Sequence, residues 1–134
     1  MPITMLIDTS GIYSLMDRKE RFHALAGECY SRSTIRLTHS YVLAELVPLC
    51  RTRGFPREAV LTYLLEVVKD PSVELVWVDY QLHSDAVKLL EERPDKDYSL
   101  CDAVSFVLMR QYNLADALTT DKHFEQEGFT RLLK

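Results

Sequence analysis

Glycine, cysteine and long apolar segments are scarce in this sequence. Four glycines among 134 residues, and the absence of any run rich in Pro, Ser and Gly, give no sign of a linker, a repeat or a low-complexity segment. No apolar run approaches the roughly 18 residues that a membrane-spanning helix needs, so no membrane association is expected. Residues 1–7 have no basic stretch before their apolar part and do not resemble a signal peptide.

The three cysteines, Cys29, Cys50 and Cys101, are odd in number and widely spaced. They form no Cys-x-x-Cys pair, so neither a zinc site nor a redox motif is indicated. Each lies among apolar residues, which is typical of a reduced core thiol and of a cytoplasmic protein. The histidines are scattered and form no ligand pairs, which also disfavours zinc. His123 stands close to Asp121 in sequence, and a structural or exposed position is expected for it.

The composition is that of a globular protein with a mild excess of acid. Hydrophobic residues make up 47% and charged residues 27%, and the chain is long enough for one domain, residues 1–134, with one full core. The net charge of −4 does not favour nucleic acid, because phosphate contacts need Lys and Arg. Basic residues are grouped in two places: the first group is Arg18, Lys19 and Arg21, and the second is Arg51, Arg53 and Arg57. A solvated surface is the ordinary interpretation of each group.

Short apolar runs alternate along the chain with segments of helical periodicity. Strands are predicted at residues 3–7, 35–37, 73–78, 117–120 and 129–133. Helices are predicted from residue 12 onward and over 19–32, 41–50, 56–70, 82–93, 99–113 and 122–128. This alternation predicts an α/β fold with three layers, in which helices cover both faces of a mostly parallel central sheet.

Four acidic residues stand at the ends of predicted elements or inside them. Asp8 and Asp121 end two strands, and the ends of parallel strands face the same edge of a sheet, where sites lie. Asp102 is in the first turn of a helix. Glu45 interrupts an almost continuously apolar helix, which is predicted to be buried and to be kinked at Pro48. A buried lone carboxylate is costly unless it is paired, protonated or bound to a metal.

Each acid also has an ordinary structural interpretation. Asp8 could cap a helix, Ser99 and Asp102 match the capping-box pattern, and Glu45 could reach solvent or pair with a basic residue. Together the four are harder to explain in this way, because converging carboxylates raise one another's pKa unless a cation lies between them. Mg²⁺ or Mn²⁺ is the natural cation for oxygen ligands, and it can activate water against a phosphodiester.

Four motifs in order along the chain resemble the PIN domain, and the VapC toxins of toxin–antitoxin modules are the most similar subgroup. They are Asp8-Thr-Ser, Ser40-Tyr-Val-Leu-Ala-Glu45-Leu, Asp97-Tyr-Ser-Leu-Cys-Asp102-Ala-Val-Ser-Phe106 and Leu118-Thr-Thr-Asp121-Lys-His-Phe124. The resemblance covers essentially the whole chain and implies an α/β/α fold with Mg²⁺- or Mn²⁺-dependent endoribonuclease activity. It implies that the metal ligands are Asp8, Glu45, Asp102 and Asp121.

The resemblance also implies supporting residues and partners. Asp97 falls where some members carry a further acid, and Ser10 and Thr120 fall where polar residues support the site. The family commonly forms homodimers and is inhibited by a small antitoxin, for which helices over residues 41–69 are the expected docking surface. RNA would be the substrate, and the Arg51, Arg53 and Arg57 group is the candidate for contact with it.

Three other interpretations stay open or can be weighed on the sequence. A PIN nuclease could act in RNA processing without an antitoxin, or a PIN-like domain could only bind a partner, although the presence of all four acids counts against loss of catalysis. A phosphotransfer enzyme with Asp8 as nucleophile is disfavoured. Haloacid-dehalogenase-type enzymes need a second Asp two residues on, where this chain has Ser10, and receiver domains need an acidic pair.

Overall fold

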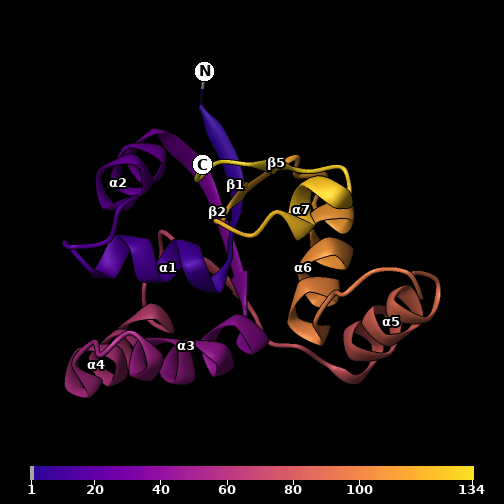
Figure 1. Ribbon diagram of the computed structural model, residues 1–134, viewed down its shortest axis with the longest axis horizontal. Helices are drawn as coiled ribbons and strands as arrows, with labels where there is room; N and C mark the ends of the chain where they lie inside the picture. Colours follow the sequence, from indigo (N-terminus) through magenta and orange to yellow (C-terminus); the bar gives the residue numbers. More distant parts are fainter. Residues whose placement is uncertain (1) are drawn as a thin grey trace.

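A computed structural model, which describes residues 2–134, contains one sheet of five parallel strands between two layers of helices (Figure 1). The strand order is β3-β2-β1-β4-β5. The strands are β1 (Ile3–Ile7), β2 (Ser33–His39), β3 (Glu74–Val76), β4 (Asp116–Leu118) and β5 (Thr130–Arg131). The predicted three-layer α/β fold is therefore confirmed, and all of the strand pairings are parallel.

Helices α1 to α4 cover one face of the sheet, and α5 to α7 cover the other (Figure 1). The helices are α1 (Thr9–Met16), α2 (His23–Arg32), α3 (Ser40–Thr52), α4 (Arg57–Val67), α5 (Tyr80–Glu91), α6 (Leu100–Gln111) and α7 (His123–Gln126). Several predicted bounds were wrong by a few residues: β2 is longer than residues 35–37, whereas β3 and β5 are shorter than the runs predicted for them.

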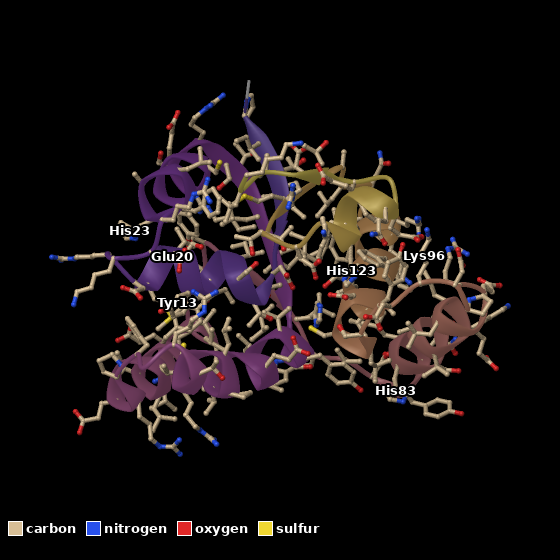
Figure 2. The ribbon with its side chains drawn as sticks, in the orientation of Figure 1. Tyr13, Glu20, His23, His83, Lys96 and His123 are labelled. Atoms are coloured by element: carbon tan, nitrogen blue, oxygen red, sulfur yellow. The ribbon has the colours of Figure 1, made fainter. Side chains whose placement is uncertain are left out.

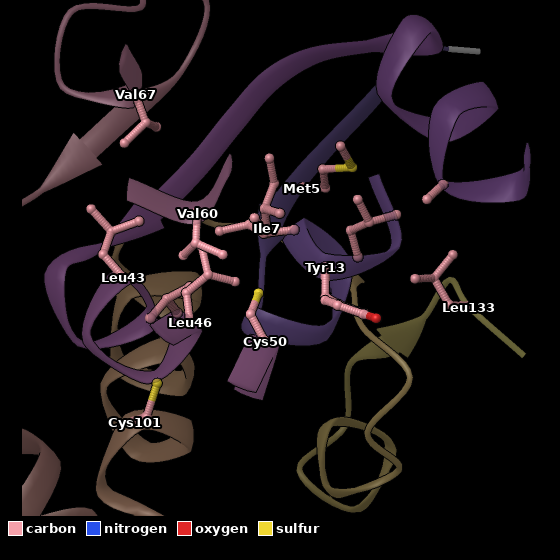
Figure 3. Packing of buried hydrophobic residues seen from close by; sticks show 14 of the residues in the cluster. Met5, Ile7, Tyr13, Leu43, Leu46, Cys50, Val60, Val67, Cys101 and Leu133 are labelled. Atoms are coloured by element: carbon pink, nitrogen blue, oxygen red, sulfur yellow. The ribbon is translucent and has the colours of Figure 1, made fainter. Parts of the chain in front are cut away.

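The central strand β1 divides the hydrophobic core into two parts. Met5 and Ile7 pack with α1, α3 and α4 (Figure 3), whereas Leu6 points to the α5–α6 side. Successive side chains of a strand point to opposite faces, so an apolar run without alternation is what a strand covered on both faces requires. All three cysteines are buried and free, as expected for core thiols. None of the helices in the described part of the chain is long and apolar enough to cross a membrane.

One glycine fixes how the first helix meets the sheet. A Cβ atom at Gly11 would collide with the carbonyl oxygen of Leu118, a backbone atom of β4. The Asp8 amide donates to the same carbonyl at 3.2 Å. The start of α1 therefore lies directly against the end of β4, and this close approach brings the residues after β1 beside the residues after β4.

Candidate active site

A cavity of about 560 Å³ lies at the carboxyl end of the sheet. It is bounded by the β1–α1 and β4–α7 connections, one face of α3, and the start of α6 with the loop before it. All four acids singled out in the sequence line it, as do Asp97, Ser10 and Thr120. The full lining is Asp8, Thr9, Ser10, Glu45, Pro48, Leu49, Arg53, Asp97, Ser99, Asp102, Thr120, Asp121 and His123.

Asp8 follows β1 and is only 6% exposed. The pKa of Asp8 is raised to about 7, and burial is the largest cause. The carboxylates of Asp102 and Asp121 also raise this pKa, whereas the Thr119 hydroxyl, which donates to Asp8 Oδ2 at 2.9 Å, lowers it. Asp8 precedes α1, but its side chain makes no capping hydrogen bond. The capping interpretation therefore fails for this residue, and its carboxylate is held toward the cavity.

Asp102 is both a helix cap and a member of the cavity wall. Its amide donates to Ser99 Oγ at 3.0 Å, and its Oδ2 accepts from the Ser99 amide at 3.1 Å, which completes a capping box. Burial raises the pKa of Asp102, the Ser99 amide lowers it, and Asp121 raises it. The cap fixes the rotamer of this carboxylate, so the structural role and a role in the cavity are compatible.

Glu45 lies in the cavity wall, but its environment differs from the prediction. The expectation that α3 would be buried on nearly every side is wrong, because Ala44, Glu45 and Pro48 are exposed. The buried side chains of α3 are Val42, Leu43, Leu46 and Cys50, spaced three or four residues apart or adjacent on one face, and they turn the Glu45 face outward. Glu45 Oε1 accepts a long hydrogen bond of 3.4 Å from Thr9 Oγ1. Helix α3 continues through Pro48 to Thr52.

His123, for which a structural or exposed position was expected, is partly exposed and lies between two of the acids. Its Nδ1 atom is 3.1 Å from Asp121 Oδ1 and 3.4 Å from Asp102 Oδ2. Neither approach has the geometry of a hydrogen bond, so this buried nitrogen has no hydrogen-bond partner within residues 2–134. The His123 amide also donates to Asp121 Oδ1 at 2.9 Å. The spacing Asp-x-His at the start of a one-turn helix was the signal available in the sequence.

A hydroxyl network, of which Thr119 was not anticipated, connects the two strand ends. The Thr120 amide donates to Ser10 Oγ at 3.0 Å, and Ser10 Oγ lies 3.2 Å from Thr119 Oγ1. Thr119 Oγ1 also accepts from the Asp121 amide at 3.0 Å. Thr119 therefore contacts residues on both sides of the cavity floor. Asp97, in contrast, is exposed at the rim.

The three arginines proposed for RNA contact do not lie together. Arg53 lines the acidic cavity. Arg51 and Arg57 line a second cavity of about 400 Å³ between α3 and α4, with Phe55 and Val60 among its other residues. Among the described residues, Arg53 is thus the only Arg or Lys side chain in the cavity wall.

The donor set of the cavity fits a hard divalent cation. Asp102, Asp121 and His123 each offer a ligand atom, and these atoms lie within 4.8 Å of one another. Within residues 2–134, neither Asp8 nor Asp102 has an ion pair with Lys or Arg. Buried carboxylates with raised pKa values and an unpartnered imidazole nitrogen are what a cation would satisfy. Oxygen-rich ligands favour Mg²⁺ or Mn²⁺.

Comparisons with known proteins identify the family of this chain. The model of the PIN domain family matches residues 5–129, so the chain belongs to the PIN domain family. It is 28% identical over 129 residues to the 23S rRNA-specific endonuclease VapC20 from two strains of Mycobacterium tuberculosis, covering 96% of this chain and 97% of the relative.

A solved structure extends this similarity to the fold. The crystal structure of M. tuberculosis VapC20, described as a sarcin–ricin loop cleaving toxin, superposes with a TM-score of 0.85 at 24% identity, over 95% of this chain and 97% of that one. The resemblance to PIN-domain VapC proteins is therefore confirmed. The homology to a VapC endonuclease indicates that this chain is a nuclease.

Proposed function

We propose that this protein is a divalent-metal-dependent endoribonuclease and the toxin of a VapBC-type toxin–antitoxin pair. The observation that carries the proposal is that four acids from four separate parts of the chain line one cavity, and that two of them are buried and have no ion pair with Lys or Arg within residues 2–134. Asp8, Glu45, Asp102 and Asp121 would hold Mg²⁺ or Mn²⁺. His123 is a further candidate ligand, because its unpartnered Nδ1 faces Asp102 and Asp121.

When bound, the ion would lower the pKa of water and stabilise negative charge on the leaving oxygen of a phosphodiester. The side chains of the site have distinct tasks in this proposal. Asp8 and Asp102 are oriented by Thr119 and Ser99, so they keep their carboxylate oxygens in place before substrate arrives. Glu45 is exposed and loosely held by Thr9, which suits a carboxylate that orients an attacking water on the substrate side.

The substrate and partner parts of the proposal rest on the relatives. VapC20 acts on 23S rRNA, and this chain covers nearly all of it, so structured ribosomal RNA is the first substrate to test. A small antitoxin, a homodimer and a cytoplasmic location are proposed on the same grounds, and the three buried free cysteines suit a reducing compartment. A PIN nuclease that processes RNA without an antitoxin is the alternative function.

Cleavage of defined RNAs tests the proposal directly. A transcript containing the sarcin–ricin loop and an unrelated hairpin would be incubated with wild type, with Asp8→Asn and with Asp102→Asn, each in Mg²⁺, in Mn²⁺ and in EDTA. Wild type should cut only with metal, and each variant should lose roughly a hundred-fold or more in rate. Asp85→Asn on α5, an acid outside the cavity, is the control and should cut like wild type.

Two outcomes would contradict the nuclease assignment. One is a folded wild-type protein that cuts no RNA in either metal. The other is cutting that persists in EDTA or in both variants, since that activity would not come from the acidic cavity.

A further inference from the structure

One face of α3 leads away from the acids and ends at an arginine. Glu45, Leu49 and Arg53 are spaced four residues apart, and all three line the cavity. The rise of a helix places Arg53 about 12 Å along the axis from Glu45. Arg53 therefore stands about two helical turns from Glu45 in the wall of the same cavity, where it can meet a phosphate of a strand that also passes the acids.

The backbone and an aromatic ring hold Arg53 at this position. Helix α3 ends in a Schellman motif: Gly54, with φ of 71°, donates to the Arg51 carbonyl at 3.1 Å, and the Phe55 amide donates to the Cys50 carbonyl at 2.9 Å. The Arg53 guanidinium lies over the Tyr13 ring, 5.1 Å from its centroid. The guanidinium is therefore pre-oriented, although about half of the side chain is exposed.

An acid from another part of the chain already occupies the anion position on Arg53. Arg53 donates to Glu20 Oε2 at 2.9 Å, and Glu20 Oε1 accepts from the Arg21 amide at 3.0 Å. Glu20 belongs to the α1–α2 loop, and Figure 2 shows it beside Tyr13 and well to the left of His123. A carboxylate bound by a guanidinium and a backbone N–H has the hydrogen-bond pattern that a phosphate group would also accept.

We infer that Arg53 binds a phosphate of the RNA strand next to the cleaved one, and that the Glu20 carboxylate holds this position in the free protein. The strand would pass along the α3 face and reach the α1–α2 loop, whose exposed Arg18, Lys19 and Arg21 add positive charge. This inference deepens the proposed function, on which it rests, and it separates Arg53 from Arg51 and Arg57, which line a different cavity.

Binding can be measured apart from cleavage. A fluorescein-labelled single-stranded RNA of mixed sequence would be titrated in Mg²⁺ against the Asp8→Asn protein and against that protein carrying Arg53→Gln, Arg53→Lys, Glu20→Gln or Arg51→Gln. Arg51 is the matched control, because it is an exposed arginine in the last turn of the same helix and outside the acidic cavity. Thermal unfolding of each protein verifies that it is folded.

The expected pattern is specific to this position. Arg53→Gln should weaken binding roughly ten-fold and reduce the slope of log affinity against log salt by about one. Arg53→Lys should restore part of the loss. Glu20→Gln should tighten binding, because the phosphate no longer competes with a carboxylate, and Arg51→Gln should change little. In wild type that cleaves RNA, Arg53→Gln should raise KM more than it lowers kcat.

Three results would overturn the inference. The first is equal RNA affinity of the Arg53→Gln and Arg51→Gln proteins, and the second is no RNA binding by the Asp8→Asn parent. The third result would indicate that Arg53 binds an acidic peptide instead of RNA: the Arg53→Gln protein would lose binding to oligo-glutamate, and its binding to RNA would be unchanged. If instead wild type cuts no RNA while Arg53→Gln weakens binding as expected, the nuclease proposal fails and the RNA contact stands.

Discussion

Thr119 donates a hydrogen bond to Asp8 across 111 positions of sequence, and so connects the ends of β4 and β1 at the floor of the acidic cavity. The same hydroxyl oxygen accepts from the Asp121 amide at 3.0 Å. One buried side chain thereby orients two of the proposed metal ligands. Since hydrogen bonds to the charged form favour it, Thr119 also keeps the pKa of Asp8 lower than burial alone would leave it.

Thr119→Val is expected to lower both stability and metal-dependent activity. The change keeps the shape of the side chain but removes a hydrogen bond from the buried Asp8 carboxylate and the acceptor of the Asp121 amide, which costs about 1–3 kcal/mol in unfolding free energy. Loss of an orienting contact should reduce the cleavage rate roughly 10–100-fold. Thr120→Val is the matched control, because in the described structure Thr120 hydrogen-bonds only through its backbone. Equal effects of the two changes in urea unfolding and cleavage assays would contradict this assignment.

Gly11→Ala should destabilise the protein, whereas Gly27→Ala should not. A Cβ at Gly11 would collide with the backbone carbonyl of Leu118, which cannot move without shifting β4, so a loss of about 1–3 kcal/mol is expected. Gly27, exposed in α2, has open space around its Cα, and alanine there should stabilise the helix by about 0.5–1 kcal/mol. Urea unfolding of both variants measures the contrast, and a stable Gly11→Ala protein would show that α1 can move away from the sheet.

These contacts show what the sequence could predict and what it could not. The positions of Asp8 and Asp121 could be predicted from a simple rule. Apolar runs in the sequence identify the buried parallel strands, and the carboxyl ends of parallel strands lie at one edge of the sheet. That reasoning placed the acids near one another, and their roles as metal ligands stay a prediction. Thr119 escaped notice because its partner is distant in sequence, and no local pattern reports a contact of that kind.

Helix faces were the second source of error. The prediction for Glu45 counted how many apolar residues surround it in sequence, but the direction of a side chain depends on which face of α3 meets the core. Arg51 and Arg53, two residues apart, point to different cavities for the same reason. The place of His123 beside Asp102 could not be read from the sequence, where the histidines were weighed as pairs of zinc ligands rather than as neighbours of carboxylates.

Glu127→Gln should weaken the attachment of the loop that carries Asp97. The Glu127 carboxylate, almost fully buried, accepts from Arg93 at 3.1 Å, Arg110 at 2.7 Å and the Tyr98 hydroxyl at 2.9 Å. Burial alone would raise the pKa of Glu127, but these hydrogen bonds outweigh it and lower the pKa. The substitution should cost about 2 kcal/mol, since three donors then share one neutral amide.

The pH dependence of stability provides the check on Glu127. A group whose pKa is lowered by folding stabilises the protein at pH values above its pKa in the unfolded state. This contribution is lost as the pH falls through its pKa in the folded state. Wild type should therefore lose stability in acid relative to Glu127→Gln, and the two should converge once the pH is below the lowered pKa of Glu127 in the folded protein. Glu125→Gln, which removes a more exposed carboxylate paired with Lys134 and Arg131, should change unfolding little at any pH. A constant difference across the range would mean that packing, not charge, explains the effect.

Asp8→Asn is expected to abolish cleavage and yet to stabilise the metal-free protein at neutral and higher pH. Folding raises the pKa of Asp8 from 3.8 to about 7, with burial the largest cause, so the folded state holds the proton more tightly. The contribution of Asp8 to the free energy of unfolding is fully present below pH 3.8 and is lost as the pH rises through 7. This loss amounts to a few kcal/mol. Asparagine has no charge to desolvate. In EDTA, the variant should therefore match wild type near pH 4 and exceed it in melting temperature at pH 8.

Metal should make wild type more stable than Asp8→Asn at pH 8, the reverse of the order in EDTA, because a cation stabilises the ionised carboxylate that burial penalises. At pH 8 saturating Mg²⁺ or Mn²⁺ should raise the melting temperature of wild type well above its value in EDTA, and should do so much less at pH 5, where protons compete for Asp8. Asp8→Asn should respond weakly at both pH values. Scanning calorimetry with and without metal measures all four conditions. A metal effect of equal size in wild type and Asp8→Asn would place the cation away from Asp8, and the four-acid centre would then have to be abandoned.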